Sequence, residues 1–182
     1  MPTNEELQNQ FRQMIQDRSF AIEYALQYVG TFYSWGGDDP AAWDCSGLLS
    51  EIAQAVGYIK RNERLTAEGF RTRFIEYKID EMIPGCAVIF FDKEQNKATH
   101  IEMAISRGRT IGASGGGSKT ITKEDAMRDN AFVKIRPLNT GDKREIIFLD
   151  PIMSLYPDIW KESTSKLIIP EKNIIRGNKN VN

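Results

Sequence analysis

The sequence predicts an α+β fold in which helices come first and an antiparallel β-sheet follows. Up to about residue 77, the apolar residues recur mostly at intervals of three and four, which is the helical spacing. From residue 87 they instead fall in short apolar or alternating segments bounded by turn residues. A chain of 182 residues that is 41% hydrophobic has enough apolar material for one domain with a core. A run of helices followed by a run of strands is typical of α+β architecture.

The helical part divides into three segments. Residues 4–28 contain no Pro or Gly and are expected to form one or two amphipathic helices. Residues 30–40 are rich in Gly and Asp and are expected to form a loop. A second helix is expected to start at Asp44 or Cys45, and residues 65–77 are a further helical candidate.

The strands are expected to form a meandering antiparallel sheet. They are residues 87–91, 100–105, 109–113, 132–135 and 145–149. Residues 1–150 would then be a single domain. Residues 151–182 carry several prolines and a basic end, and are expected to be a C-terminal extension that is partly packed and then loose from residue 172.

Charge and composition exclude several classes of protein. The 24 basic and 25 acidic residues nearly cancel, so no nucleic-acid partner is expected. No run approaches the roughly 20 apolar residues of a membrane span, and residues 1–18 lack the apolar core of a signal peptide. We therefore expect synthesis in the cytoplasm. One His and two Cys cannot supply a four-ligand zinc site, and no metal or cofactor is expected.

Cys45 is the first candidate for chemistry, because it follows a glycine-rich turn at a predicted helix start. Free amides at a helix N-terminus favour a thiolate and can also donate to an oxyanion. His100 is the only imidazole available to protonate a leaving amine. Taken singly, a buried Cys and a strand His are more often structural. Cys86, inside an apolar run, is expected to be a core thiol.

A longer pattern surrounds these residues. It comprises Tyr33-x-Trp-Gly-Gly, Trp43-Asp-Cys-Ser-Gly-Leu-Leu49, Pro84-Gly85-Cys-Ala-Val-Ile-Phe-Phe91 and Thr99-His100-Ile-Glu-Met-Ala. Over residues 21–137 the sequence resembles the NlpC-type family of cysteine peptidases, papain-like enzymes that cleave peptides of bacterial peptidoglycan. The resemblance implies a papain-like fold, with the nucleophile at a helix start packed on an antiparallel sheet.

The resemblance also implies roles for single residues. Cys45 would be the nucleophile and His100 the base that also protonates the leaving group. Tyr33 would donate to the oxyanion or to substrate. Asp44 would shape the helix start, and Ser46 would lie close to the bound peptide.

Two aromatic residues of the pattern, Trp35 and Trp43, could line a substrate groove, although core packing is the default for each.

The sequence departs from the family at one position. The polar residue that usually orients the catalytic imidazole falls at Gly112, which has no side chain. Ser114 and Glu102 are nearby substitutes, and either could instead be an ordinary solvated polar residue.

The first functional hypothesis is a peptidoglycan endopeptidase that cleaves a γ-D-glutamyl–diamino acid type of bond through a thioester acyl-enzyme. The lack of a signal segment and of wall-binding repeats resembles a phage-type lysin, which would act at the wall after release or as part of a phage particle. A monomer is expected. The alternatives are a catalytically weak wall-binding or phage structural module, and an amidase or acyltransferase using the same Cys-His pair.

Overall fold

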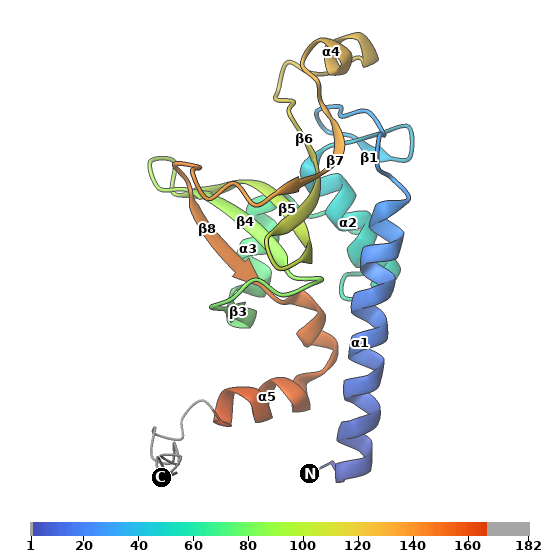
Figure 1. Ribbon diagram of the computed structural model, residues 1–182, viewed down its shortest axis with the longest axis vertical. Coiled ribbons are helices and arrows are strands. Elements are labelled where there is room, and N and C mark those ends of the chain that lie inside the picture. Colours follow the sequence, from blue (N-terminus) through green and yellow to red (C-terminus); the bar gives the residue numbers. More distant parts are fainter. Residues whose placement is uncertain (1, 167–182) are drawn as a thin grey trace, which may run out of the picture.

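The computed structural model describes residues 2–166 and consists of helices packed against an antiparallel sheet (Figure 1). The helices are α1 (Asn4–Leu26), α2 (Cys45–Val56), α3 (Ala67–Phe74), α4 (Lys123–Arg128) and α5 (Pro157–Lys166), with 3₁₀ turns η1 (Ile75–Tyr77) and η2 (Pro151–Leu155). The strands are β1 (Asp38–Asp39), β2 (Ala42–Trp43), β3 (Lys78–Ile79), β4 (Ala87–Asp92), β5 (Lys97–Ser106), β6 (Arg109–Ser114), β7 (Phe132–Pro137) and β8 (Glu145–Leu149). The predicted α+β class is confirmed.

α1 forms one helix of 23 residues, which decides between the one or two helices expected. Thr3 caps it: its hydroxyl accepts from the Glu6 backbone N–H, and the Glu6 carboxylate accepts from the Thr3 N–H. The helix buries Met14, Ala21 and Ala25 and lies against α2. It extends well beyond α2 toward the N-terminus, where α5 lies near it (Figure 1).

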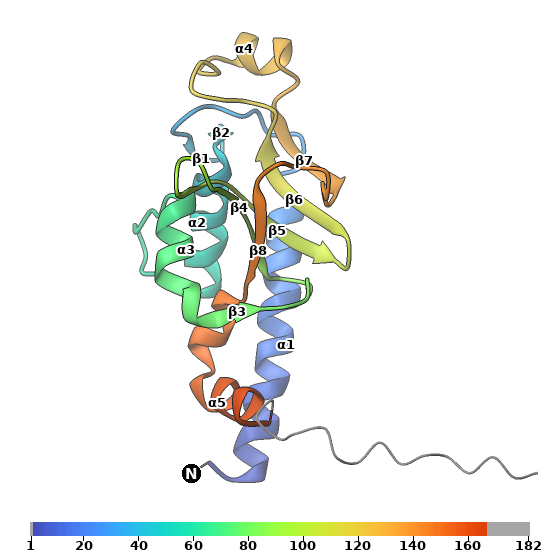
Figure 2. The same cartoon turned by 90° about the vertical axis from the view of Figure 1, so that its left-hand side faces the viewer.

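α2 is the central helix of the molecule. It starts at Cys45, with Asp44 as its N-cap, and ends at Gly57, whose φ of 99° is the left-handed conformation that favours glycine. Its apolar residues Leu48, Leu49 and Ile52 are at most 1% exposed. α2 packs on β5 and β6, and α3 also packs on β5, so both helices cover the same region of the sheet (Figure 2).

The main sheet has six antiparallel strands in the order β3-β8-β4-β5-β6-β7. β4 to β7 form the expected meander, but β8 returns to pair with the other edge of β4. The simple meander was therefore wrong in that one connection. The reason lies in β4, whose residues 87–90 are all buried. Such an apolar strand is stable when both of its edges are paired within the sheet.

Several short elements were not predicted. β1 and β2 form a small hairpin that begins inside the expected loop. α4 has six residues and buries only Ala126, so it gives no helical apolar period. Its start carries a capping box between Thr122 and Asp125. α4 lies at the opposite end of the molecule from α5 (Figure 1).

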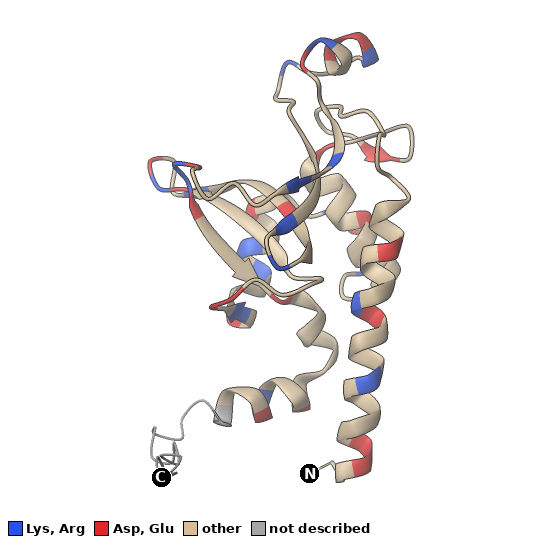
Figure 3. Ribbon diagram, in the orientation of Figure 1, with Lys and Arg blue, Asp and Glu red and all other residues tan. Residues whose placement is uncertain are grey.

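The C-terminal extension is described as far as residue 166. η2 buries Pro151, Ile152 and Met153, and the Asp150 carboxylate forms a buried ion pair with Arg18 of α1. The expected loose segment from residue 172 onward lies outside the described residues. Lys, Arg, Asp and Glu are interspersed on the long helix α1 (Figure 3). Of the helices between residues 2 and 166, none has the length and apolar character needed to cross a bilayer.

Candidate active site

Cys45 is the first residue of α2, and the loop before it is fixed by the carboxylate of Asp44. Asp44 accepts hydrogen bonds from the Gly47 N–H at 2.6 Å, from the Ser46 hydroxyl at 3.0 Å and from the Gly36 N–H at 3.1 Å. The first N–H groups of a helix have no partner within the helix. Within residues 2–166 the backbone N–H of Cys45 has no hydrogen-bond partner, so it is available to a ligand beside the sulfur.

The glycine-rich turn presses directly on this helix start. A Cβ built at Gly47 would lie 2.0 Å from the Gly37 carbonyl oxygen, which is far closer than any real contact. That same oxygen accepts a hydrogen bond from the Asp44 N–H at 2.9 Å. Glycine at position 47 is therefore what allows the turn to hold the residues in front of Cys45.

His100 approaches from β5, directly after a β-bulge. Ala98 pairs with Phe91 and His100 with Phe90, so Thr99 is an extra residue without a partner in the register. Bulges of this kind bend a strand and redirect the next side chain. The imidazole then stacks near the Phe90 ring, with 5.2 Å between ring centroids, and 14% of the His100 side chain stays exposed.

The imidazole lies between Cys45 and Glu102. Its Nε2 is 2.9 Å from Glu102 Oε1, and since a carboxylate only accepts, Nε2 donates in this bond. Nδ1 is the ring nitrogen left for the hydrogen bond with Cys45. Burial lowers the pKa of His100, but the hydrogen bonds and charges of Cys45 and Glu102 outweigh it and raise the pKa from 6.5 to about 9. An imidazolium at neutral pH is the result.

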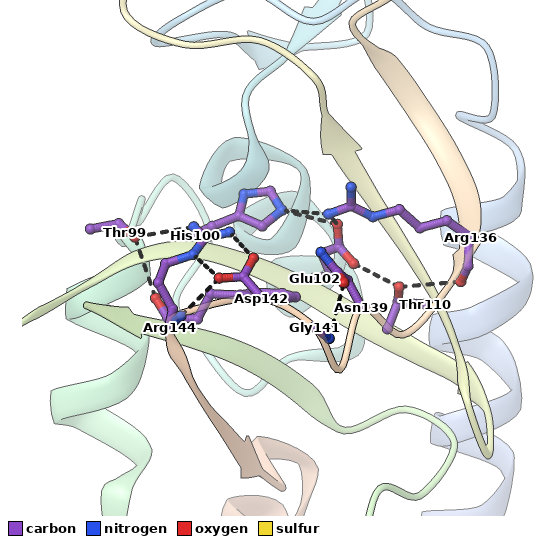
Figure 4. A network of polar contacts seen from close by, with 10 residues as sticks. Thr99, His100, Glu102, Thr110, Arg136, Asn139, Gly141, Asp142 and Arg144 are labelled. Atoms are coloured by element: carbon purple, nitrogen blue, oxygen red, sulfur yellow. Dashed lines mark hydrogen bonds and ion pairs between the residues drawn. The ribbon is translucent and has the colours of Figure 1, made fainter. Parts of the chain in front are cut away.

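Glu102 is itself held on both oxygens, although only 1% of it is exposed. The Thr110 hydroxyl donates to Oε2 at 2.6 Å, and the Arg136 guanidinium pairs with Oε1 (Figure 4). Burial raises the pKa of Glu102, but the hydrogen bond and charge of His100, the hydrogen bond of Thr110 and the charge of Arg136 lower it from 4.5 to about 2. The carboxylate is thus ionised beside the imidazolium.

Gly112 and Glu102 are sterically linked across β5 and β6. A Cβ at Gly112 would lie 2.7 Å from Glu102 Cγ, so the glycine leaves the space that the Glu102 side chain fills. Of the two predicted substitutes, Glu102 contacts His100. Ser114 does not: its hydroxyl is buried and has no partner within residues 2–166.

Tyr33 completes the surroundings of the sulfur. It is 3% exposed and lines both cavities that border Cys45. Burial, together with the negative charges of Cys45 and Asp44, raises the pKa of Tyr33 above its usual range. Its hydroxyl therefore stays protonated and can donate a hydrogen bond.

Cys45 lies where two cavities meet. The larger, of about 740 Å³, extends along α3 and the start of β5. The smaller, of about 300 Å³, contains His100, Arg136 and the glycine-rich segment 115–117. Residues that border both cavities are Tyr33, Trp35, Cys45 and Thr99. An extended substrate lying across Cys45 would place one half in each cavity.

The two tryptophans predicted to line the groove differ in their exposure. Trp35 is 57% exposed and stands over both cavities. Trp43 is a correction: it is 0% exposed and packs edge-on against Tyr28 with ring centroids 5.1 Å apart. Trp43 is a core residue, because its alternation in β2 turns it away from the cleft.

Sequence reasoning missed three arginines. Arg64 pairs with Asp44 at 2.5 Å and lines the larger cavity. Arg136 and Arg144 line the smaller one. They come from the loop between α2 and α3, from β7 and from the segment before β8, so the tertiary packing of distant segments brings them to one cleft.

Residues 30–139, more than half of the chain, match the model of the NlpC/P60 family. The chain belongs to this family. Its NlpC/P60 region contains Tyr33, Cys45, His100 and Glu102, and ends after β7.

Curated relatives agree with this membership. Dipeptidyl-peptidase 6 of Lysinibacillus sphaericus is 31% identical over 102 residues, which are 56% of this chain and 34% of the relative. The Listeria seeligeri protein named "Probable endopeptidase p60" is 31% identical over 98 residues, which are 54% of this chain and 18% of the relative. This NlpC/P60 chain thus spans between 18% and 34% of the length of these relatives.

Solved structures share the fold. The P60 domain of an antigen from M. avium subspecies paratuberculosis superimposes with a TM-score of 0.56 at 18% identity, covering 77% of this chain and 98% of that one. An NlpC/P60 family protein from Bacillus cereus gives 0.55 at 20% identity, covering 71% and 39%. The NlpC/P60 domain of the peptidoglycan hydrolase SagA gives 0.50 at 19% identity, covering 71% and 96%.

Proposed function

We propose that the protein is a cysteine endopeptidase that cleaves the peptides of bacterial peptidoglycan. The observation that carries this proposal is the imidazole of His100, held between the ionised Glu102 and Cys45, which lies at the junction of two cavities. Family membership and relatives named as endopeptidases support it. A structural neighbour described as a peptidoglycan hydrolase is consistent with the substrate.

In the first half-reaction the Cys45 thiolate attacks the carbonyl carbon of the amide and a C–S bond forms. The resulting oxyanion would accept from the Cys45 N–H and the Tyr33 hydroxyl. The C–N bond then breaks, and the amine departs with the proton of the His100 imidazolium. A thioester and a neutral imidazole remain.

In the second half-reaction the neutral His100 removes a proton from water, and the hydroxide attacks the thioester carbon. The C–S bond breaks, which returns the Cys45 thiolate beside an imidazolium and releases the acid product. Glu102 orients the ring throughout and stabilises its charged form through Nε2.

The bond proposed is the one between the γ-carboxyl of D-glutamate and the diamino acid that follows, with action at the cell wall. Residues 1–150 would form the catalytic domain and residues 151–182 its extension. Asp44 is fully engaged with Arg64 and with the start of α2, so we assign it a positioning role. Ser46 and Trp35 remain the proposed contacts for substrate on either side of the sulfur.

The test is digestion of purified peptidoglycan and of isolated stem peptides, followed by mass spectrometry of the fragments. We expect the wild type to release a new amine on the diamino acid, whereas Cys45→Ala and His100→Ala release nothing. Circular dichroism of both variants controls for folding. Turnover by either folded variant would contradict the proposed site.

The same digestion separates the alternatives. A free lactyl carboxyl on the sugar would indicate an amidase. Binding without any cleavage by the wild type would indicate a catalytically silent wall-binding module.

A further inference from the structure

The smaller cavity presents hydrogen-bond donors and no carboxylate. Its charged or titratable lining groups besides Cys45 are Tyr33, His100, Arg136 and Arg144. Arg136 pairs with Glu102 and Arg144 with Asp142, but neither carboxylate lines the cavity. The Glu102 and Asp142 side chains are only 1% and 14% exposed. The larger cavity differs, because Asp44 and Glu68 stand among its cations.

Two residues of the smaller cavity carry side-chain donors that have no partner within residues 2–166. Arg136 uses only Nη2 in its contacts with Glu102 and His100, so Nε and Nη1 are left free. The Ser114 hydroxyl is buried without a partner in a residue that is 4% exposed. Arg144 is less available, because its Nε, Nη1 and Nη2 bind Asp142 and Thr99.

The position of His100 decides which half of the substrate enters this cavity. The group that protonates the departing amine must contact its nitrogen, so the leaving residue lies on the imidazole side of the sulfur. His100 lines the smaller cavity and not the larger one. The acyl half of the substrate then occupies the larger cavity.

We infer that the smaller cavity is a carboxylate-binding subsite in which Arg136 and Ser114 select a leaving residue with a free carboxylate. This inference rests on the proposed function. A guanidinium with two free donors is well matched to a carboxylate, and a buried hydroxyl left without a partner is costly until a ligand satisfies it. A leaving residue that ends in an ammonium would instead face Arg136 and Arg144.

A diamino acid can present a carboxylate in two places. One is its α-carboxyl, and the other is a second carboxyl at the end of the side chain, as in meso-diaminopimelate. Lysine has an ammonium group at that end without the second carboxyl. The test therefore uses L-Ala-γ-D-Glu-X tripeptides with X as meso-diaminopimelate or lysine, each with a free or an amidated α-carboxyl.

We expect kcat/KM to be roughly 10 to 100 times higher for a peptide with the recognised leaving-side carboxylate than for its counterpart without it. Comparing the free with the amidated α-carboxyl, and diaminopimelate with lysine, shows which carboxylate the subsite binds. In Arg136→Gln this ratio falls to about one, while Arg136→Lys retains part of it. The ratio is the readout because Arg136 also supports Glu102, so absolute rates fall for every substrate.

Lys97→Gln is the matched control, because it removes one positive charge from the larger cavity and should leave the ratio unchanged. A wild-type ratio of about one for both pairs of peptides would overturn the inference and leave the peptidase intact. If the wild type cleaves none of the tripeptides or peptidoglycan, the proposed function fails. In that case, calorimetry with Cys45→Ala tests the subsite by comparing the affinity for each peptide that has the leaving-side carboxylate with the affinity for its counterpart without it. Equal affinities would overturn the inferred subsite.

Discussion

The most informative single residues are Gly112 and Glu102, because each explains the other. A side chain at position 112 would collide with Glu102 Cγ, and Glu102 supplies the acceptor for Nε2 of His100. In the sequence, Gly112 argued against catalysis because it cannot orient the imidazole. In the structure, Gly112 leaves the space for Glu102, which does orient it. The amide in Glu102→Gln would keep the shape and lose the charge that holds the imidazolium.

We predict that Glu102→Gln lowers kcat by about 10- to 1,000-fold with a smaller effect on KM, because general acid–base catalysis loses its orienting charge. Steady-state kinetics on the stem peptide measures this. Glu145→Gln, the same change on a partly exposed residue of β8, is the control and should retain the wild-type rate. Equal losses in the two variants would argue against a specific role for Glu102.

The charges at the site also set a pH dependence. The pKa of His100 is raised from 6.5 to about 9, so its contribution to stability is fully present below pH 6.5 and is lost as the pH rises through about 9. The pKa of Glu102 is lowered from 4.5 to about 2, so its contribution is present above pH 4.5 and is lost as the pH falls toward 2.

We therefore predict that the alkaline limb of kcat/KM falls near pH 9 in the wild type and moves to lower pH in Glu102→Gln. Urea unfolding of the wild type and His100→Gln from pH 6 to 10 gives a second readout. Their difference in free energy of unfolding should shrink over the upper part of that range. A constant difference would mean that His100 is not stabilised as a cation.

At the scale of elements, the sequence predicted the helices and strands that have a long apolar pattern. It missed the short elements that only a few contacts stabilise. The starts of α2 and β4 were within reach because capping and apolar runs are local signals. The return of β8 to β4 and the bulge at Thr99 depend on pairing between distant segments. Local patterns cannot reveal such pairing. Arg136 was missed for the same kind of reason, because the pairing of β7 with β6 carries it to the cleft.

The turn against α2 gives a prediction at this scale. Gly47→Ala places a methyl group against the Gly37 carbonyl, and the backbone must move to accept it. We expect a loss of about 1–3 kcal/mol in the free energy of unfolding, together with a fall in kcat as Cys45 shifts. Gly117→Ala, where a Cβ meets nothing within 4 Å, should unfold like the wild type in the same denaturant titration.

On the scale of the whole molecule, α1 is joined to the residue that follows β8 by the buried pair of Arg18 and Asp150. Their side chains are 13% and 3% exposed, and Arg18 also donates to the Pro84 carbonyl at 3.3 Å. The pair connects α1 to the residue before η2. α1 also contacts η2 and α5.

We predict that Arg18→Met costs about 3–5 kcal/mol in the free energy of unfolding, because it leaves the Asp150 charge buried without its partner. Guanidinium unfolding followed by fluorescence measures the change. Arg128→Met removes an arginine whose side chain is 61% exposed and should change the stability by less than about 1 kcal/mol. A small effect in both variants would show that Asp150 is solvated when Arg18 is absent.

The placement of His100 and Glu102 two residues apart on β5 has a consequence for engineering. Base and orienting acid lie two residues apart on one strand, so that strand sets their separation. The neighbouring strands supply the groups that hold the acid, and the cysteine is aligned with the pair by its helix. A short His-x-Glu strand segment, with a glycine facing the acid, is thus a portable half of a hydrolytic site for transfer into other antiparallel scaffolds.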